Sequence, residues 1–110
     1  MSKTVLFSEP ALADLLVIND YYLVEVNETV AAKLVDQLET AVNSLSELAG
    51  RGSIPKELLS LGMRQYRQLI IKPYRIIYES LPEQVIVHAI LDGRRDIQSL
   101  LTQRLLLVDW

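Results

Sequence analysis

Two adjacent arginines stand at the end of the most apolar segment of the sequence. The run QVIVHAIL leads into Asp92 and Gly93 and then, without a spacer, into Arg94 and Arg95. Side chains that follow a glycine at a strand end are presented to solvent rather than packed. Guanidinium groups bind phosphate or carboxylate oxygens, so we expect at least one of the two to contact an anion. The alternative is a solvated turn or an ion pair with Asp92 or Asp96.

Arg75 lies at the start of a second apolar run and His88 lies within the first, and each has a functional and a structural interpretation. Arg75 is either a functional cation or half of an ion pair to a neighbouring strand. A histidine side chain can carry a proton near neutral pH, and His88 is the only histidine of the sequence. It shares a strand face with Ile86 and Ile90, which favours a half-buried packing residue with one hydrogen bond.

Aromatic and basic residues alternate just before Arg75. Arg64 and Arg67 flank Tyr66, and they either extend a positive groove or line a solvated edge. Tyr66 is open to stacking on a nucleic-acid base. We expect Tyr74 and Tyr78 to pack against a helix with their hydroxyls at the rim.

Composition limits the class of protein. The 110 residues are half hydrophobic and predict a single domain spanning residues 1–110. Without cysteine there are no disulfides or thiolate metal sites, and no metal-ligand cluster, phosphate loop or nucleophile triad occurs, so we expect no metal and no cofactor. The N-terminal apolar run is broken by Ser8 and Pro10, and no segment reaches the length of a membrane span. We therefore expect a cytoplasmic protein without membrane contact.

The charge is unevenly distributed along the chain. The formal net charge of −3 argues against bulk affinity for nucleic acid. Residues 1–60 carry four basic and nine acidic side chains, residues 64–95 six and three, and residues 96–110 one and two. The positive charge is therefore gathered in the second half.

The first half predicts a strand and two helices. Residues 4–7 are β-prone, and Ser8-Glu9-Pro10 is a helix start with a capping hydroxyl and an early proline. Asn27 can turn the chain and cap a second helix, whose apolar residues recur every three or four positions from Val30 to Leu48. The short connection predicts an antiparallel helical hairpin.

The second half predicts strands. Glycines and a proline interrupt the helical pattern over residues 51–62, where one short helical turn is expected at residues 56–61. Strands are predicted at residues 63–71, 74–79 and 85–91, and a terminal helix at residues 96–107. The predicted fold class is α+β: an N-terminal helical hairpin packed on a small twisted antiparallel sheet (β-α-α-β-β-β), with a short C-terminal helix. The apolar tail TQRLLLVDW either docks on the core or offers a partner surface that includes Trp110.

Residues 72–101, KPYRIIYESLPEQVIVHAILDGRRDIQSLL, resemble the toxins of the RelE/ParE superfamily, the stable partners of bacterial type II toxin–antitoxin pairs of the plasmid-stabilisation kind. The resemblance rests on a Tyr-Arg that opens an apolar strand, a short acidic hairpin, a second apolar strand, and then a glycine, basic residues and an acid. It implies a cognate antitoxin as partner. The expected assembly is either a toxin–antitoxin hetero-oligomer or a homodimer of the toxin.

The superfamily contains two activities. RelE-like members cut messenger RNA on the ribosome, using two lysines, two arginines and a tyrosine, whereas ParE-like members poison DNA gyrase without a comparable catalytic set. Arg75 and Arg95 match the two arginines, with Arg94 the less favoured match for the second. The lysine positions fall on Tyr66 and Gln68, and the tyrosine position on Leu101.

The incomplete set and the acidic chain favour a ParE-like toxin that inhibits growth by binding gyrase. Target or antitoxin contacts are expected from Arg64, Tyr66, Arg67, Arg75, Arg94, Arg95 and Trp110. The alternatives are a ribosome-dependent endoribonuclease and a degenerate, non-toxic member. If the chain is a nuclease, the resemblance and the residue types point to Arg75, Arg95, Arg67 and His88.

Overall fold

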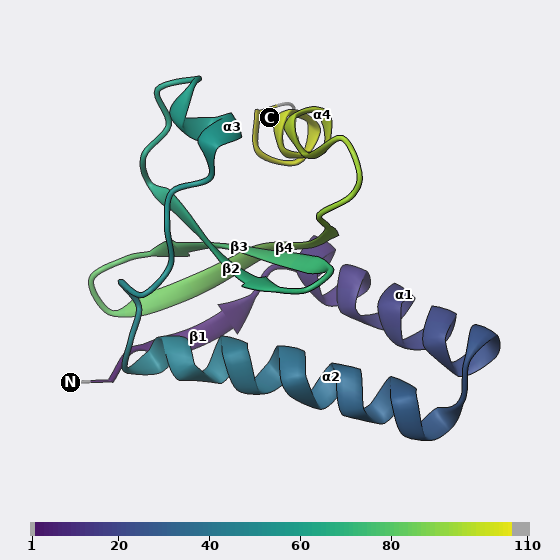
Figure 1. Cartoon of the computed structure of the whole chain (residues 1–110). Coiled ribbons are helices and arrows are strands. Elements are labelled where there is room, and N and C mark those ends of the chain that lie inside the picture. Colours follow the sequence, from purple (N-terminus) through teal and green to yellow (C-terminus); the bar gives the residue numbers. More distant parts are fainter. Residues whose placement is uncertain (1, 107–110) are drawn as a thin grey trace.

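Four strands form one mixed sheet in a computed structural model, which describes residues 2–106 (Figure 1). The strands are β1 (Thr4–Phe7), β2 (Tyr66–Ile71), β3 (Tyr74–Ser80) and β4 (Gln84–Asp92), in the order β1-β4-β3-β2. β2, β3 and β4 pair antiparallel, as predicted, but β1 pairs parallel to β4. The sheet is therefore mixed, whereas the sequence predicted an antiparallel one.

The helical hairpin forms as predicted. It consists of α1 (Glu9–Glu25) and α2 (Glu28–Asn43), followed by a 3-10 turn, η1 (Ser44–Ser46). The Ser8 hydroxyl accepts a hydrogen bond from the Ala11 N–H, and the Asn27 side chain accepts one from the Val30 N–H. Both caps are local, so they could be read from the sequence.

The hairpin covers one face of the sheet. Its buried side chains pack against every second residue of β3, namely Tyr74, Ile76 and Tyr78. From α2, Leu38 and Ala41 are buried as predicted. The two ends of the predicted stripe, Val30 and Leu48, are exposed. Val30 lies at the start of α2, which extends past the sheet, and Leu48 follows η1, beyond the end of the helix (Figure 1).

The other face of the sheet is covered by α3 (Lys56–Leu59), α4 (Ile97–Leu101) and a π-helical turn, η2 (Thr102–Leu106). A second cluster joins these elements to the sheet and comprises Leu58, Ile77, Ala89, Leu91, Ile97 and Leu101. The α+β class and the order of elements are thus confirmed, with the sheet as the middle of three layers (Figure 1). Within residues 2–106 no helix combines the length and apolar composition required to span a bilayer.

His88 is the extra residue of a β-bulge. Ile77 pairs with Ala89 while its neighbour Tyr78 pairs with Val87, so the residue of β4 between them has no partner residue on β3. A bulge of this kind bends the strand and changes which side chains face each layer. Before the bulge Val85 and Val87 face the hairpin; after it Ile90 does, while Ala89 and Leu91 face the layer of α3 and α4.

Candidate functional site

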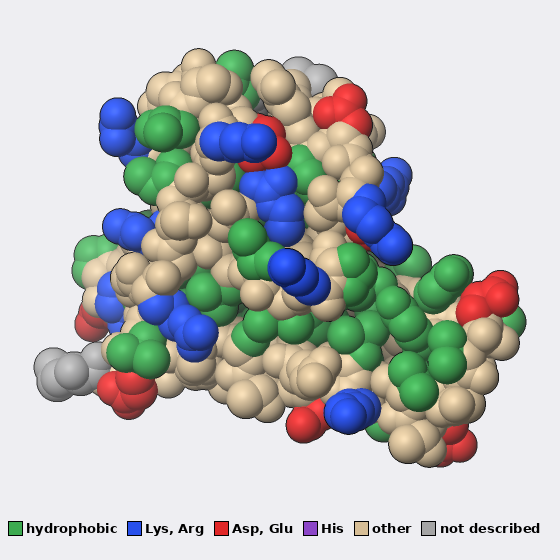
Figure 2. Space-filling model, in the orientation of Figure 1, with side chains coloured by type: hydrophobic (Ala, Val, Ile, Leu, Met, Phe, Trp, Pro, Cys, Tyr) green, Lys and Arg blue, Asp and Glu red, His purple; other side chains and the backbone are tan. Residues whose placement is uncertain are grey.

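The first helix is apolar on nearly all sides. Ala11, Leu15 and Ile18 are buried, yet Val17 is 67% exposed, Tyr21 58% and Val24 81%. A surface helix normally keeps one polar face, so an exposed apolar flank marks a surface that awaits a partner. Figure 2 shows hydrophobic side chains gathered over the part of the hairpin that projects beyond the sheet.

A groove of about 600 Å³ lies between α1 and the C-terminal end of β4. We call it the α1–β4 groove, and it is lined by Asp14, Val17, Ile18, Tyr21, Tyr22, Val26, Tyr74, Ile90, Leu91, Asp92, Arg94 and Arg95. Its floor and one wall are apolar and aromatic. The two arginines that the sequence singled out lie on its rim.

The rim carries net positive charge. Arg94 forms an ion pair with Asp92, with Nη2 and Oδ2 2.6 Å apart, while its guanidinium remains 75% exposed. Hydrogen bonds from the side chain and the N–H of Arg94 lower the pKa of Asp92 to about 2, so this carboxylate stays ionised. Arg95 is exposed and forms no ion pair with a described residue. An incoming carboxylate or phosphate would therefore meet donors that are not fully used.

Tyrosines form the aromatic wall of the groove. Tyr21 and Tyr22 contact each other edge to face, with ring centroids 5.2 Å apart. Burial, and then the neighbouring Tyr22 hydroxyl, raise the pKa of Tyr74 far above its ordinary value, so this phenol stays protonated. The sequence placed Tyr74 in the core, where it lies, but it did not single out Tyr21 or Tyr22.

An ion pair closes the base of the groove. The carboxylate of Asp14 accepts a hydrogen bond from the Ile90 N–H at 3.0 Å and two from Arg104, at 3.0 and 3.1 Å. Arg104 also donates to the carbonyl of His88. Beyond Val87 the edge of β4 no longer pairs with β1. There these two side chains form hydrogen bonds with the backbone N–H and C=O groups of β4.

Arg75 belongs to the opposite face of the sheet. Its guanidinium donates two hydrogen bonds of 2.9 Å to Glu57 in α3 and one of 2.7 Å from Nε to Gln68. Hydrogen bonding by Arg75 lowers the pKa of Glu57. The structure therefore does not bring Arg75 into the α1–β4 groove with Arg94 and Arg95, and its charge is compensated.

The remaining predicted site residues lie elsewhere. His88 is half-buried, with Nε2 3.0 Å from Glu79 Oε1 and its ring edge to face with Tyr66. Burial, and then the charge of Glu79, raise the pKa of Tyr66. Arg67 donates to the carbonyl of Gly52 at the outer edge of β2, and Arg64 is exposed just before that strand. Trp110 lies outside the described residues.

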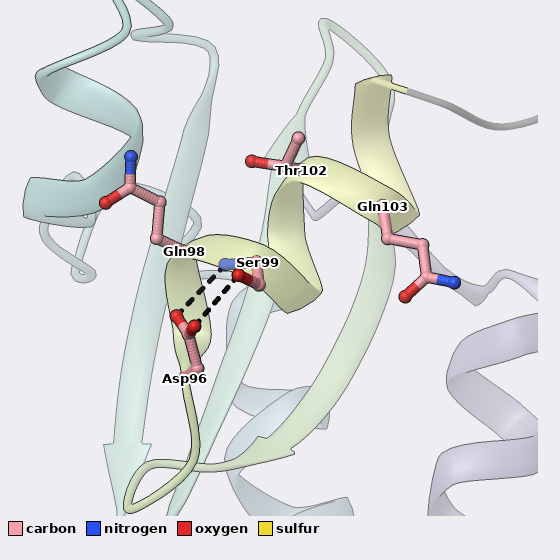
Figure 3. A pocket seen from close by; sticks show the side chains of 5 residues that line it. All are labelled: Asp96, Gln98, Ser99, Thr102 and Gln103. Carbon is pink, nitrogen blue, oxygen red and sulfur yellow. Dashed lines mark hydrogen bonds between the residues drawn. The ribbon is translucent and has the colours of Figure 1, made fainter.

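A second hollow, of about 500 Å³, lies on the exposed side of α4 (Figure 3). Its five polar side chains include Asp96, which accepts hydrogen bonds from the N–H and hydroxyl of Ser99 and thereby caps the helix. These bonds lower the pKa of Asp96. Because its carboxylate serves the helix, we assign this hollow no function. In the described part of the chain, no three His, Cys, Asp or Glu side chains are grouped to hold a metal ion.

Comparison with known proteins agrees with this architecture. Residues 5–97 match the family described as the ParE toxin of the type II toxin–antitoxin system parDE. The chain belongs to this family. The resemblance seen at residues 72–101 is thereby confirmed, on the ParE-like side of the superfamily, and the chain is a type II toxin.

A solved structure shares the fold of this ParE toxin. The chromosomal ParDE toxin–antitoxin system from P. aeruginosa aligns with a TM-score of 0.67 and 21% sequence identity, covering 81% of this chain and 94% of that one. A search of curated proteins finds no match.

Proposed function

We propose that this ParE toxin acts in the cytoplasm and is neutralised by a cognate antitoxin that occupies the α1–β4 groove. The observation that carries the proposal is the exposed apolar flank of α1, formed by Val17, Tyr21 and Val24, beside a groove of about 600 Å³. Leaving such a surface in water is unfavourable by roughly 25 cal/mol for each Å² of apolar area that a partner would cover. An amphipathic segment of the antitoxin fits this surface.

The rim adds specificity to the apolar contact. We infer that an acidic side chain of the antitoxin binds Arg95 and the exposed side of Arg94. Because Arg94 and Arg95 are adjacent in the chain and are the cations among the residues that line the groove, this contact would fix the direction in which the segment lies. Free toxin, with the groove empty, is proposed to bind DNA gyrase and to inhibit growth by trapping it on DNA.

The first experiment tests the antitoxin site. The toxin is expressed together with its cognate antitoxin, and growth and co-purification are measured. Val17→Asp places an acid on the apolar flank and is expected to abolish rescue and co-purification. Leu61→Asp, which alters an exposed apolar residue before β2, is the matched control and should be rescued. Equal rescue of both variants would contradict the proposed site.

The second experiment tests the target. The toxin is induced without its antitoxin, and the same cells are examined for gyrase-dependent DNA breaks and for cleaved messenger RNA. We expect breaks and intact messages. Cleaved messages with intact DNA would identify a RelE-like endoribonuclease instead, and unimpaired growth would identify a non-toxic member of the family.

A further inference from the structure

We propose that the outer edge of β2 is a second binding surface, which takes the phosphate backbone of a nucleic acid. This β2 edge surface consists of Arg51, Arg64, Arg67 and Lys72. It goes beyond the proposed function because it lies away from the α1–β4 groove and needs no antitoxin.

The segment that contains β2 is almost devoid of acids. Residues 48–78 carry six cations and one acid, Glu57, in a chain whose formal net charge is −3. Glu57 is held by Arg75 through two hydrogen bonds, so it does not pair with any of the four cations of the β2 edge surface. None of the four residues of the β2 edge surface forms an ion pair with a described residue. The positive charge of this surface is therefore not compensated by ion pairs.

The topology places these cations along one edge. β2 is the last strand of the sheet, and the chain beside it is the loop before α3, which pairs through Ser53 and Gln68. Arg64 precedes β2, Arg67 lies within it, Lys72 follows it, and Arg51 lies in the neighbouring loop. Figure 2 shows Lys and Arg side chains over the sheet and the loops beside it.

Two of the guanidinium groups are held in place. Arg67 donates to the Gly52 carbonyl at 2.7 Å, and Arg51 donates to the Ser44 hydroxyl at 2.9 Å. Both charges lie close enough to the Tyr78 hydroxyl to oppose the rise that burial causes in its pKa. That hydroxyl is itself bonded to Gly52 and Ala49, which fixes the loop on the strand. Groups positioned in advance lose less freedom when they bind a ligand.

A hollow adjoins this pair. It encloses about 610 Å³ between α2 and the turn after β2, and its lining includes Arg51, Lys72, Thr40 and Ser44, with Asp36 as its acid. Two cations on the two sides of a hollow are suited to a phosphate group between them. This hollow gives the β2 edge surface a concave end.

The chemistry of the edge favours a nucleic acid over an acidic protein. Stable protein interfaces depend on buried aromatic or aliphatic anchors, and within β2 the exposed large hydrophobic residue is Ile70 alone. The phosphates of a nucleic-acid backbone, in contrast, recur at regular intervals, and Lys and Arg side chains are sufficient to bind them. The six residues of β2 extend for about 20 Å, which corresponds to about six base pairs of duplex along the helix axis. The contact should be independent of base sequence.

The test measures binding of the full-length toxin to a labelled mixed-sequence DNA duplex and to a single-stranded RNA, each of about 20 nucleotides, by fluorescence anisotropy between about 20 and 200 mM salt. The variant Arg51→Gln/Arg64→Gln/Lys72→Gln removes three cations from the surface. The control Lys3→Gln/Lys33→Gln/Lys56→Gln removes three cations outside this surface and outside the α1–β4 groove, and it leaves the same net charge. Circular dichroism checks that both are folded.

We expect the wild type and the control to bind with similar affinity, and the surface variant to bind at least about tenfold more weakly at low salt. Its plot of log affinity against log salt should be less steep by about 2 to 3, since each lost phosphate contact removes about 0.9. The nucleic acid that the wild type binds with higher affinity, DNA or RNA, is identified as the ligand. Three outcomes would overturn the proposal: no binding by the wild type at the lowest salt, equal loss in both variants, or displacement of the nucleic acid by polyglutamate at equal charge.

Discussion

Arg75 is bound to Glu57 through two parallel hydrogen bonds of 2.9 Å, and this pair joins α3 to the middle of the sheet. Both side chains are largely buried, at 13% and 15% exposure. The arginine that matches a catalytic position of RelE-like nucleases thus stabilises the fold in this ParE toxin. A loss of activity on substituting Arg75 could therefore result from a less stable fold and would not by itself show a catalytic role.

The first prediction concerns this pair. Glu57→Gln should lower the free energy of unfolding by about 3 kcal/mol, because it leaves the Arg75 charge largely buried without its partner. Urea denaturation at neutral pH measures the change. The double variant Glu57→Leu/Arg75→Met, which replaces the pair with apolar groups, should recover most of the loss. A change within about 0.5 kcal/mol for the single variant would mean that the pair behaves as a solvated surface pair.

The same pair predicts a pH dependence. Arg75 lowers the pKa of Glu57 below its ordinary value of 4.5, so the unfolded chain binds this proton more readily than the folded one. The contribution is therefore fully present above the ordinary pKa and is lost as the pH falls through the lower, folded value. The difference in unfolding free energy between wild type and Glu57→Gln should be constant above about pH 5.5 and shrink below about pH 4.5. A difference that persists undiminished at pH 3 would contradict the assignment.

A third prediction concerns Gly52, which lies against β2 and β3. A Cβ at this position would lie 2.5 Å from the Gln68 carbonyl oxygen and 2.6 Å from the Tyr78 hydroxyl. Gly52→Ala should therefore push the loop off the sheet and destabilise the protein by about 2 to 3 kcal/mol. Gly50→Ala is the matched control, since a Cβ there has no neighbour within 4 Å. Thermal unfolding of the two variants should differ clearly; similar midpoints would mean that the loop relaxes.

The extent to which the sequence predicted this structure depends on how local each cause is. Ser8 and Asn27 cap the helices by bonds to residues three positions away, so the hairpin followed from the sequence. The pairing of β1 with β4 joins residues about eighty positions apart, and local patterns carry no information on its direction. The sheet was therefore predicted as antiparallel throughout.

The candidate site shows the same division. Arg94 and Arg95 were singled out because a glycine and a strand end precede them, and both lie on the groove rim. The partner of Arg75 was not predicted, because Glu57 lies in a short helix whose position is set by packing. One available signal was missed: the outer residues of α1, such as Val17 and Val24, are too apolar for a solvated helix.

The last prediction concerns the ion pair between Asp14 and Arg104, which holds η2 against α1 and the edge of β4. Arg104→Gln removes the charge and the forked geometry, so the C-terminal helical segment should open more often while the sheet remains folded. Amide hydrogens of Ile97–Leu101 should exchange at least about tenfold faster, which corresponds to about 1.4 kcal/mol. Amides in the centre of β3 and β4 should be unchanged. Arg104→Lys keeps the charge but not the fork and should give an intermediate rate. Equal acceleration across the sheet would mean that the pair stabilises the whole fold rather than this segment.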